Sequence, residues 1–191
     1  MNPDNAVGAA SPFRAALVGE PTRYMVMDDD SPVAPLLLTS DGASLTGLHL
    51  LRGPRGGIVP SPEWLYDTGP FRAVVAELKA YFAGELAIFS APLAPSGTAF
   101  QLTVWAALTD IPYGETWSYG TLARRIGHDR ASRAVGHANG RNPISILVPC
   151  HRVIGAGGAL TGYGGGLPAK AWLLRHEAVT RARRQGFAVA P

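Results

Sequence analysis

Apolar positions in the first half of the chain form two strand-like runs and one helical repeat. The runs Leu36–Thr39 and Leu45–Leu50 flank Ser40-Asp41-Gly42, a pattern that predicts a β-hairpin closed by an Asp-Gly turn. Apolar residues then recur at helical spacing from Phe71 to Phe82, and this helix should end near Gly84. A small sheet beside a helix predicts a compact α+β lobe.

Helical spacing dominates the second half of the chain. Phe100, Val104 and Leu108 recur every fourth residue and mark an amphipathic helix that should end near Asp110. The sequence Ile111-Pro112-Tyr113-Gly114-Glu115-Thr116 follows, and its Pro and Gly predict a turn.

Two short helices are predicted after this turn. Ser118 can cap a helix that runs to Ile126 and is stopped by Gly127, and a second helix spans Ser132–Asn139. Two short helices joined by a Gly-containing turn form a helix-turn-helix pattern, although any helical hairpin can imitate it. The apolar run Ile144–Val148 is expected to be a buried strand.

Composition shifts divide the chain. The first 20 residues are rich in Ala, Gly and Pro without a clear period, and we expect a flexible tail there. Residues 21–93 form the N-terminal lobe, and Ala91–Gly97 is the expected linker. Residues 97–180 form the C-terminal domain, and residues 181–191 are a second tail.

The charge is distributed unevenly. Residues 1–98 carry six Lys or Arg and ten Asp or Glu, whereas residues 99–191 carry eleven and four. A basic half favours a polyanion such as DNA through counterion release, although a solvated basic face is an open alternative. No apolar run approaches the length of a membrane span of ~20 residues, and the N-terminus lacks a secretory pattern, so a cytoplasmic location is expected.

Cys150 is the only cysteine among 191 residues and is followed directly by His151. A single thiol cannot form an internal disulfide, so it serves packing or reactivity. A free thiol is mostly protonated at neutral pH, and an assisting base turns it into the most nucleophilic side chain available. His151 is the candidate base.

The surrounding motifs resemble one known family. Val148-Pro149-Cys150-His151-Arg152-Val153, Arg133-Ala134-Val135-Gly136, Asn142-Pro143 and Gly162-Tyr163-Gly164-Gly165-Gly166-Leu167 are similar to segments of the O6-alkylguanine-DNA alkyltransferases. The resemblance is strong over residues 97–177 and weaker over residues 24–92. It implies an α+β fold with a small ribonuclease-H-like N-terminal lobe and a mainly helical, winged-helix-like C-terminal domain containing the helix-turn-helix.

The resemblance also implies a function, DNA repair by direct reversal. Cys150 would accept an alkyl group from O6 of guanine, and also from O4 of thymine, irreversibly and once per chain. His151 would reach the thiol through a water molecule, and Glu177 would orient the other nitrogen of its ring. Asn142 would brace the turn and the loop that carries the cysteine.

The remaining site residues are assigned by the same family match. Tyr119 and Arg133 would extrude the base from duplex DNA, with Ala134 and Gly136 permitting close approach in the minor groove. The pocket would be formed by Tyr163 and the backbone of Gly164, with the carbonyl groups of Cys150 and Val153 accepting from the guanine amino group. Lys170 matches a family lysine near the site.

No cofactor or metal is expected. Some relatives carry zinc in the N-terminal domain, but the five histidines here are scattered and only one cysteine is present. The expected partner is double-stranded DNA, bound by a monomer that could cooperate along the duplex. Two alternatives are open: a non-enzymatic sensor of alkylated DNA, which would lack the reactive cysteine, and a Cys-His acyl hydrolase, which would need an oxyanion hole.

Overall fold

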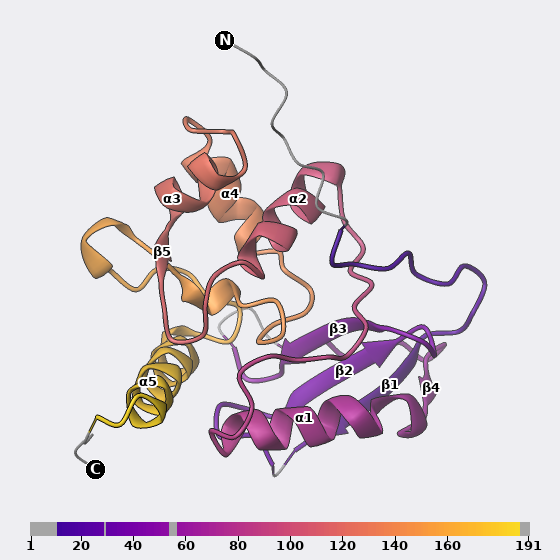
Figure 1. Ribbon diagram of the computed structural model, residues 1–191. Coiled ribbons are helices and arrows are strands. Elements are labelled where there is room, and N and C mark those ends of the chain that lie inside the picture. The colour runs from indigo at the N-terminus through magenta and orange to yellow at the C-terminus, as the bar shows by residue number, and fades with distance from the viewer. Residues whose placement is uncertain (1–10, 29, 54–56, 188–191) are drawn as a thin grey trace.

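The computed structural model describes residues 11–28, 30–53 and 57–187, which form two lobes (Figure 1). The N-terminal lobe contains a sheet with the strand order β3-β2-β1-β4. Its strands are β1 (Arg23–Met27), β2 (Leu36–Ser40), β3 (Leu45–Leu50) and β4 (Leu65–Tyr66). β2 pairs antiparallel with both β1 and β3, and β4 pairs parallel with β1.

The predicted hairpin is confirmed as β2 and β3. Leu38 pairs with Leu48, and the register shifts between Thr39 and Ser40. The Asp41 carboxylate closes the turn by accepting the Ser44 amide at 2.7 Å, so the connection is longer than a two-residue Asp-Gly turn.

The predicted helix of this lobe is α1 (Arg72–Phe82), entered through the 3-10 turn η1 (Gly69–Phe71). Figure 1 shows α1 along one face of the sheet. Val74 and Leu78 of the helix are buried in the same core as Leu36 and Leu38 of β2. The α+β fold class is confirmed, and this core holds α1 at a fixed position for the contacts described below.

The C-terminal lobe is mainly helical. In chain order it contains α2 (Ala99–Leu108), β5 (Trp117–Ser118), α3 (Tyr119–Arg125), α4 (Ser132–Asn139), η2 (Cys150–Arg152), β6 (Val153–Ile154), η3 (Ala156–Gly158) and α5 (Leu167–Arg184). The helix pair expected between residues 118 and 140 is confirmed as α3 and α4. The Ser118 hydroxyl caps α3 by accepting the Thr121 amide at 3.0 Å.

The prediction of a buried strand at Ile144–Val148 is wrong. The segment is buried but folds as a turn, with Ile146 at a positive φ of 71°. Its start lies on the edge of β3, where the Leu48 amide donates to Pro143 O at 2.8 Å and Leu48 O accepts the Ser145 amide at 3.0 Å. An apolar run cannot distinguish a buried strand from a buried turn.

The described parts of the two predicted tails make specific contacts with the fold. Within residues 11–20, the Arg14 amide donates to Leu93 O at 2.8 Å and the Leu17 amide donates to Asp41 Oδ2 at 2.9 Å. Residues 1–10 of that tail and residues 188–191 of the other lie outside the described residues. α5 continues to Arg184, so the tail expected from residue 181 begins inside this helix.

Candidate active site

Cys150 lies at the first position of η2, directly after the buried turn. Its side chain is 5% exposed, and it is a free thiol. Burial raises the pKa of Cys150, although a hydrogen bond from Asn142 and the charge of Lys170 oppose this shift. The thiol is therefore protonated at neutral pH and needs a base to become a nucleophile.

The two ring nitrogens of His151 differ in their hydrogen bonding. Nε2 lies 2.8 Å from Glu177 Oε1, and both side chains are fully buried. Nδ1 is buried and has no hydrogen-bond partner among the described residues. Burial lowers the pKa of His151, although Glu177 opposes this shift, so the ring is neutral at neutral pH and Nδ1 can accept a proton.

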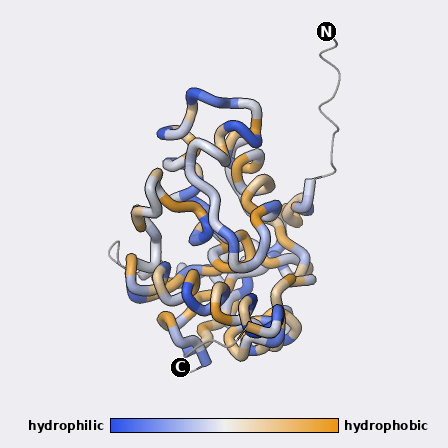
Figure 2. Tube along the Cα trace, turned by 60° about the vertical axis from the view of Figure 1, so that its left-hand side comes forward, coloured by the Kyte–Doolittle hydropathy of each residue, from blue (hydrophilic) through white to orange (hydrophobic). Residues whose placement is uncertain are grey.

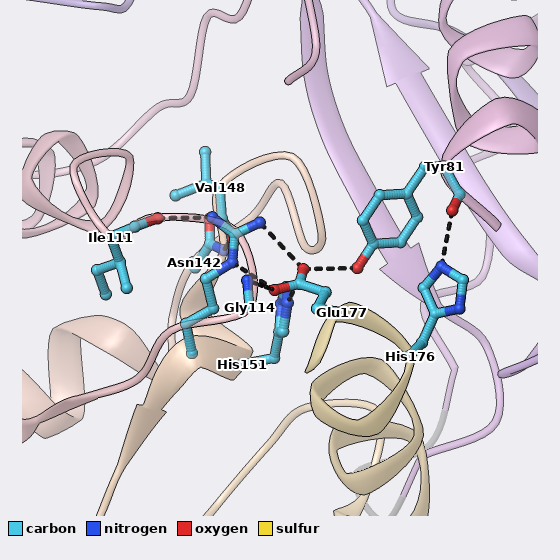
Figure 3. A network of polar contacts seen from close by, with 9 residues as sticks. Tyr81, Ile111, Gly114, Asn142, Val148, His151, His176 and Glu177 are labelled. Carbon is cyan, nitrogen blue, oxygen red and sulfur yellow. Dashed lines mark hydrogen bonds and ion pairs between the residues drawn. The ribbon is translucent and has the colours of Figure 1, made fainter. Parts of the chain in front are cut away.

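The Glu177 carboxylate accepts hydrogen bonds from four residues (Figure 3). Oε1 accepts from Tyr81 Oη at 2.7 Å, from His151 Nε2 at 2.8 Å and from an Arg152 guanidinium nitrogen at 3.0 Å. Oε2 accepts from Arg152 Nε at 2.8 Å and from the Gly114 amide at 3.1 Å. Burial raises the pKa of Glu177, but the bonds and charges of His151 and Arg152 outweigh burial and hold the pKa well below its usual range.

Sequence reasoning missed Arg152, Tyr81 and Gly114. Arg152 is buried, and a third guanidinium nitrogen donates to Ile111 O at 2.7 Å. A buried arginine paired twice with one carboxylate fixes the plane of that carboxylate. Its place directly after Cys150-His151 was a signal available in the sequence. Tyr81 offered no such signal, because its spacing is that of a core residue on α1.

Two asparagines hold the loop that carries the cysteine. Asn142 Oδ1 accepts the Ile144 amide at 3.0 Å, and its Nδ2 donates to Ile144 O at 3.3 Å and to Val148 O at 2.8 Å. Asn139, which sequence reasoning also missed, donates from Nδ2 to Cys150 O at 3.4 Å. These bonds add side-chain donors to carbonyl groups that already accept backbone amides, so the loop is held by two kinds of hydrogen bond.

Lys170 is completely buried near the start of α5. Its Nζ donates to Val153 O at 2.6 Å and to Thr161 O at 2.8 Å. Burial lowers the pKa of Lys170, while the nearby Cys150 opposes this shift. Lys170 therefore ties together the segments on both sides of η3.

The glycine run, residues 162–166, lies between the loop that carries Cys150 and the N-terminal lobe. A Cβ atom at Gly165 would lie 2.4 Å from Leu50 Cδ2, whereas one at Gly164 would meet nothing within 4 Å. Tyr163 is buried, and its hydroxyl has no hydrogen-bond partner among the described residues. A cavity of about 450 Å³ borders the run, and residues from both lobes line it, among them His49, Leu50, Trp105, Asn142, Ser145 and Gly164.

The helix-turn-helix residues lie on a separate, exposed part of the C-terminal lobe. Arg133 and Ala134 are exposed on α4, and a Cβ atom at Gly136 would lie 3.5 Å from the ring of Tyr119. The Tyr119 hydroxyl accepts from Thr161 Oγ1 at 3.1 Å, which links α3 to the loop before the glycine run. Figure 2 shows hydrophilic chain at the tip of the α3–α4 connection.

The described residues contain no group of three or more His, Cys, Asp or Glu side chains placed to hold a metal ion. Within the same part of the chain, no helix has both the length and the apolar character needed to cross a membrane.

Comparisons with known proteins identify related chains. Residues 99–179 match the family model described as 6-O-methylguanine DNA methyltransferase, DNA binding domain, and residues 22–95 match that of its ribonuclease-like domain. A methylated-DNA–protein-cysteine methyltransferase of Methanosarcina acetivorans is 52% identical over 148 residues, which cover 78% of this chain and 94% of the relative. The Mycobacterium tuberculosis protein of that name is 54% identical over 149 residues, covering 78% and 88%.

The fold has solved counterparts. The crystal structure of Mycobacterium tuberculosis OGT in complex with DNA has a TM-score of 0.76 and 51% sequence identity, covering 83% of this chain and 94% of that one. That of the O6-methylguanine methyltransferase of the same species has a TM-score of 0.75 and 50% identity, with the same coverage. On this evidence the chain belongs to the methylated-DNA–protein-cysteine methyltransferase family.

Proposed function

We propose that this protein repairs alkylated DNA by direct reversal, moving the alkyl group from O6 of guanine to Sγ of Cys150. The observation that carries the proposal is the sole thiol next to a buried His151 whose ring is bound to Glu177. Membership of the family supports this reaction, since relatives of 52% and 54% identity are named methylated-DNA–protein-cysteine methyltransferases.

The reaction is a displacement at carbon. A lone pair of Cys150 Sγ forms the new S–C bond, and the electron pair of the C–O6 bond leaves with the guanine. The thiol proton passes to Nδ1 of His151 through a bridging water molecule. The released guanine anion takes up one proton from solvent, and His151 returns one proton to solvent, so the thiol proton is balanced by the proton gained by guanine. Glu177 stabilises the imidazolium formed in this step but does not itself accept the proton, since its pKa lies well below the usual range.

The lesion is reached by base extrusion. Arg133 is exposed on α4 and would enter the base stack, while Tyr119 would guide the nucleotide out. Ala134 and Gly136 carry little or no side chain, and they would let α4 approach the backbone in the minor groove. The basic C-terminal half supplies affinity for DNA that does not depend on its sequence.

The extruded base would lie between Tyr163, Gly164 and the carbonyl groups of η2 and β6. Val153 O accepts one bond from Lys170 and retains a second lone pair for the guanine amino group. Cys150 O accepts the Val153 amide and the longer bond of 3.4 Å from Asn139. The guanine amino group would replace the bond from Asn139.

Transfer consumes the protein. Cleaving the thioether on Cys150 requires attack at an unactivated carbon, and the chain has no second thiol. We therefore propose one transfer per chain, with O4-alkylthymine as a second substrate. The protein would act as a monomer on chromosomal DNA in the cytoplasm.

Duplex DNA labelled on the O6-methyl group tests this function against the two alternatives. Alkyl transfer leaves the label on the protein, and Cys150→Ser leaves none. A sensor of alkylated DNA would leave all the label on DNA. A hydrolase would not move the label to Cys150.

A further inference from the structure

The N-terminal lobe supplies a hydrogen bond to the proposed proton relay. Tyr81 belongs to α1, yet its hydroxyl donates to Glu177 Oε1 on α5 at 2.7 Å (Figure 3). The Tyr81 side chain is completely buried, so water does not compete for this bond. The bond joins residues that lie 96 positions apart in the chain.

The tyrosine hydroxyl and the histidine ring share a single oxygen atom. Oε1 of Glu177 accepts from Tyr81 at 2.7 Å and from His151 Nε2 at 2.8 Å. A hydrogen-bond donor on a carboxylate oxygen stabilises the negative charge of that oxygen. The oxygen then attracts a second donor less strongly. Tyr81 therefore affects both the orientation of the carboxylate and its attraction for a protonated His151.

Tyr81 is itself held on several sides. His176 Nε2 lies 2.8 Å from the Tyr81 carbonyl oxygen, and its ring packs edge-on with a centroid distance of 5.5 Å. The ring of Tyr113 packs edge-on from the other lobe with a centroid distance of 6.0 Å. A ring fixed in this way directs its hydroxyl to one place.

We propose that Tyr81 is a positioning residue for alkyl transfer, through which the N-terminal lobe sets the orientation and the proton affinity of the His151–Glu177 pair. The inference rests on the proposed function above. It means that the N-terminal lobe affects alkyl transfer through one group, the hydroxyl of Tyr81.

The charged and titratable groups around the pair determine the direction of the effect. Arg152 from η2 faces both oxygen atoms of Glu177, and Tyr113 and His176 pack against the ring of Tyr81. Burial and the charge of Glu177 raise the pKa of Tyr81 well above its usual value, so the hydroxyl stays protonated as a donor. Without that donor, Oε1 interacts more strongly with His151, and the pKa of His151 rises.

The test compares Tyr81→Phe with Tyr113→Phe. Each variant loses one hydroxyl and keeps its ring in the same aromatic cluster, but the Tyr113 hydroxyl makes no hydrogen bond to Glu177. Single-turnover rates with free O6-benzylguanine are measured from acid to alkaline pH, since this substrate needs no extrusion from DNA. Thermal unfolding of both variants is recorded alongside.

We expect Tyr81→Phe to lower the plateau rate about tenfold, the scale of a lost hydrogen bond to a charged group. We also expect the acid limb of the pH profile to move upward by about half a unit, because His151 becomes harder to deprotonate. Tyr113→Phe should retain the wild-type rate and profile.

Two results would overturn the inference. One is a Tyr81→Phe rate and profile equal to those of Tyr113→Phe. The other is a lower plateau with an unmoved acid limb, which indicates a purely structural role. Failure of the wild-type protein to react with O6-benzylguanine or alkylated DNA would instead refute the proposed function.

Discussion

Nε2 of His151 and Oε1 of Glu177 lie 2.8 Å apart, and neither side chain is exposed to solvent. The two residues belong to different elements, η2 and α5, so the contact forms only when the C-terminal lobe has folded. A buried carboxylate is costly unless hydrogen bonds satisfy it, and Glu177 receives such bonds from four residues. The same bonds fix the carboxylate opposite the ring of His151.

Replacing Glu177 with Gln should abolish most alkyl transfer and weaken the fold. The change leaves Arg152 buried without its counter-charge, which costs about 3–5 kcal/mol in unfolding free energy. Chemical denaturation at neutral pH measures this loss. Glu115→Gln is the matched control, because Glu115 forms a partly exposed ion pair with Arg181 at 2.8 Å, and we expect the change to cost at most about 1 kcal/mol.

The stability of the wild-type protein should depend on Glu177 at acid pH. The folded-state pKa of Glu177 lies well below its usual range, because the bonds and charges of His151 and Arg152 outweigh the opposite effect of burial. The stabilisation is therefore complete above the unfolded-state pKa of about 4.3 and is lost as the pH falls below it. Denaturation between about pH 3 and 5 should show a steeper decline in the wild-type protein than in Glu177→Gln, since Asp41, whose pKa is also lowered, contributes to both. Equal declines would contradict the assigned shift.

The sequence predicts the local elements well because their causes are local. Ser118 predicts the start of α3 through its side-chain cap, and the hairpin of β2 and β3 follows from apolar runs around a turn. Helical spacing similarly locates α1. Each of these predictions depends on residues within a few positions of one another.

The roles of Tyr81 and Arg152 depend on a partner far along the chain, Glu177. Tyr81 looks like any core aromatic until α5 brings Glu177 to its hydroxyl. The run Ile144–Val148 looks like a strand, but only Ile144 bridges β3, and the segment then turns, with Ile146 at a positive φ. The bond of Asn139 to Cys150 O joins residues 11 positions apart, on α4 and η2. Residue chemistry makes Cys150 and His151 the candidate nucleophile and base, whereas the role of Glu177 comes from the family resemblance, and all three assignments are predictions.

Arg133→Ala should slow repair of duplex DNA much more than reaction with free O6-benzylguanine. Arg133 is exposed on α4, whereas His151 and Glu177 are buried, so the role we propose for Arg133 is extrusion of the base. Single-turnover rates on the two substrates measure the difference. Equal losses on both would place Arg133 in the chemical step.

The two adjacent glycines should respond differently to alanine. Gly165→Ala places a Cβ atom 2.4 Å from Leu50 Cδ2 and 3.1 Å from Leu50 Cβ, so the contact between the lobes must shift. We expect a loss of about 1–3 kcal/mol in unfolding free energy. Gly164→Ala is the control, since its Cβ atom meets nothing within 4 Å. Thermal and urea unfolding compare the two, and equal stability would refute the packing described here.

Changing Cys150 to Ser should abolish transfer and preserve binding to duplex DNA. A hydroxyl is a far poorer nucleophile toward carbon, while α4 and its exposed Arg133 are untouched. Binding is measured by fluorescence anisotropy and transfer by loss of O6-methylguanine. Transfer near the wild-type rate would defeat the assignment of the nucleophile.

Titration with excess alkylated duplex, followed by intact-mass and peptide-mass measurement, tests the central claim most directly. The account predicts that each chain gains one alkyl group, that the group resides on the peptide containing Cys150, and that the reaction then stops. More than one repaired base per active chain, or a modified residue other than Cys150, would contradict it.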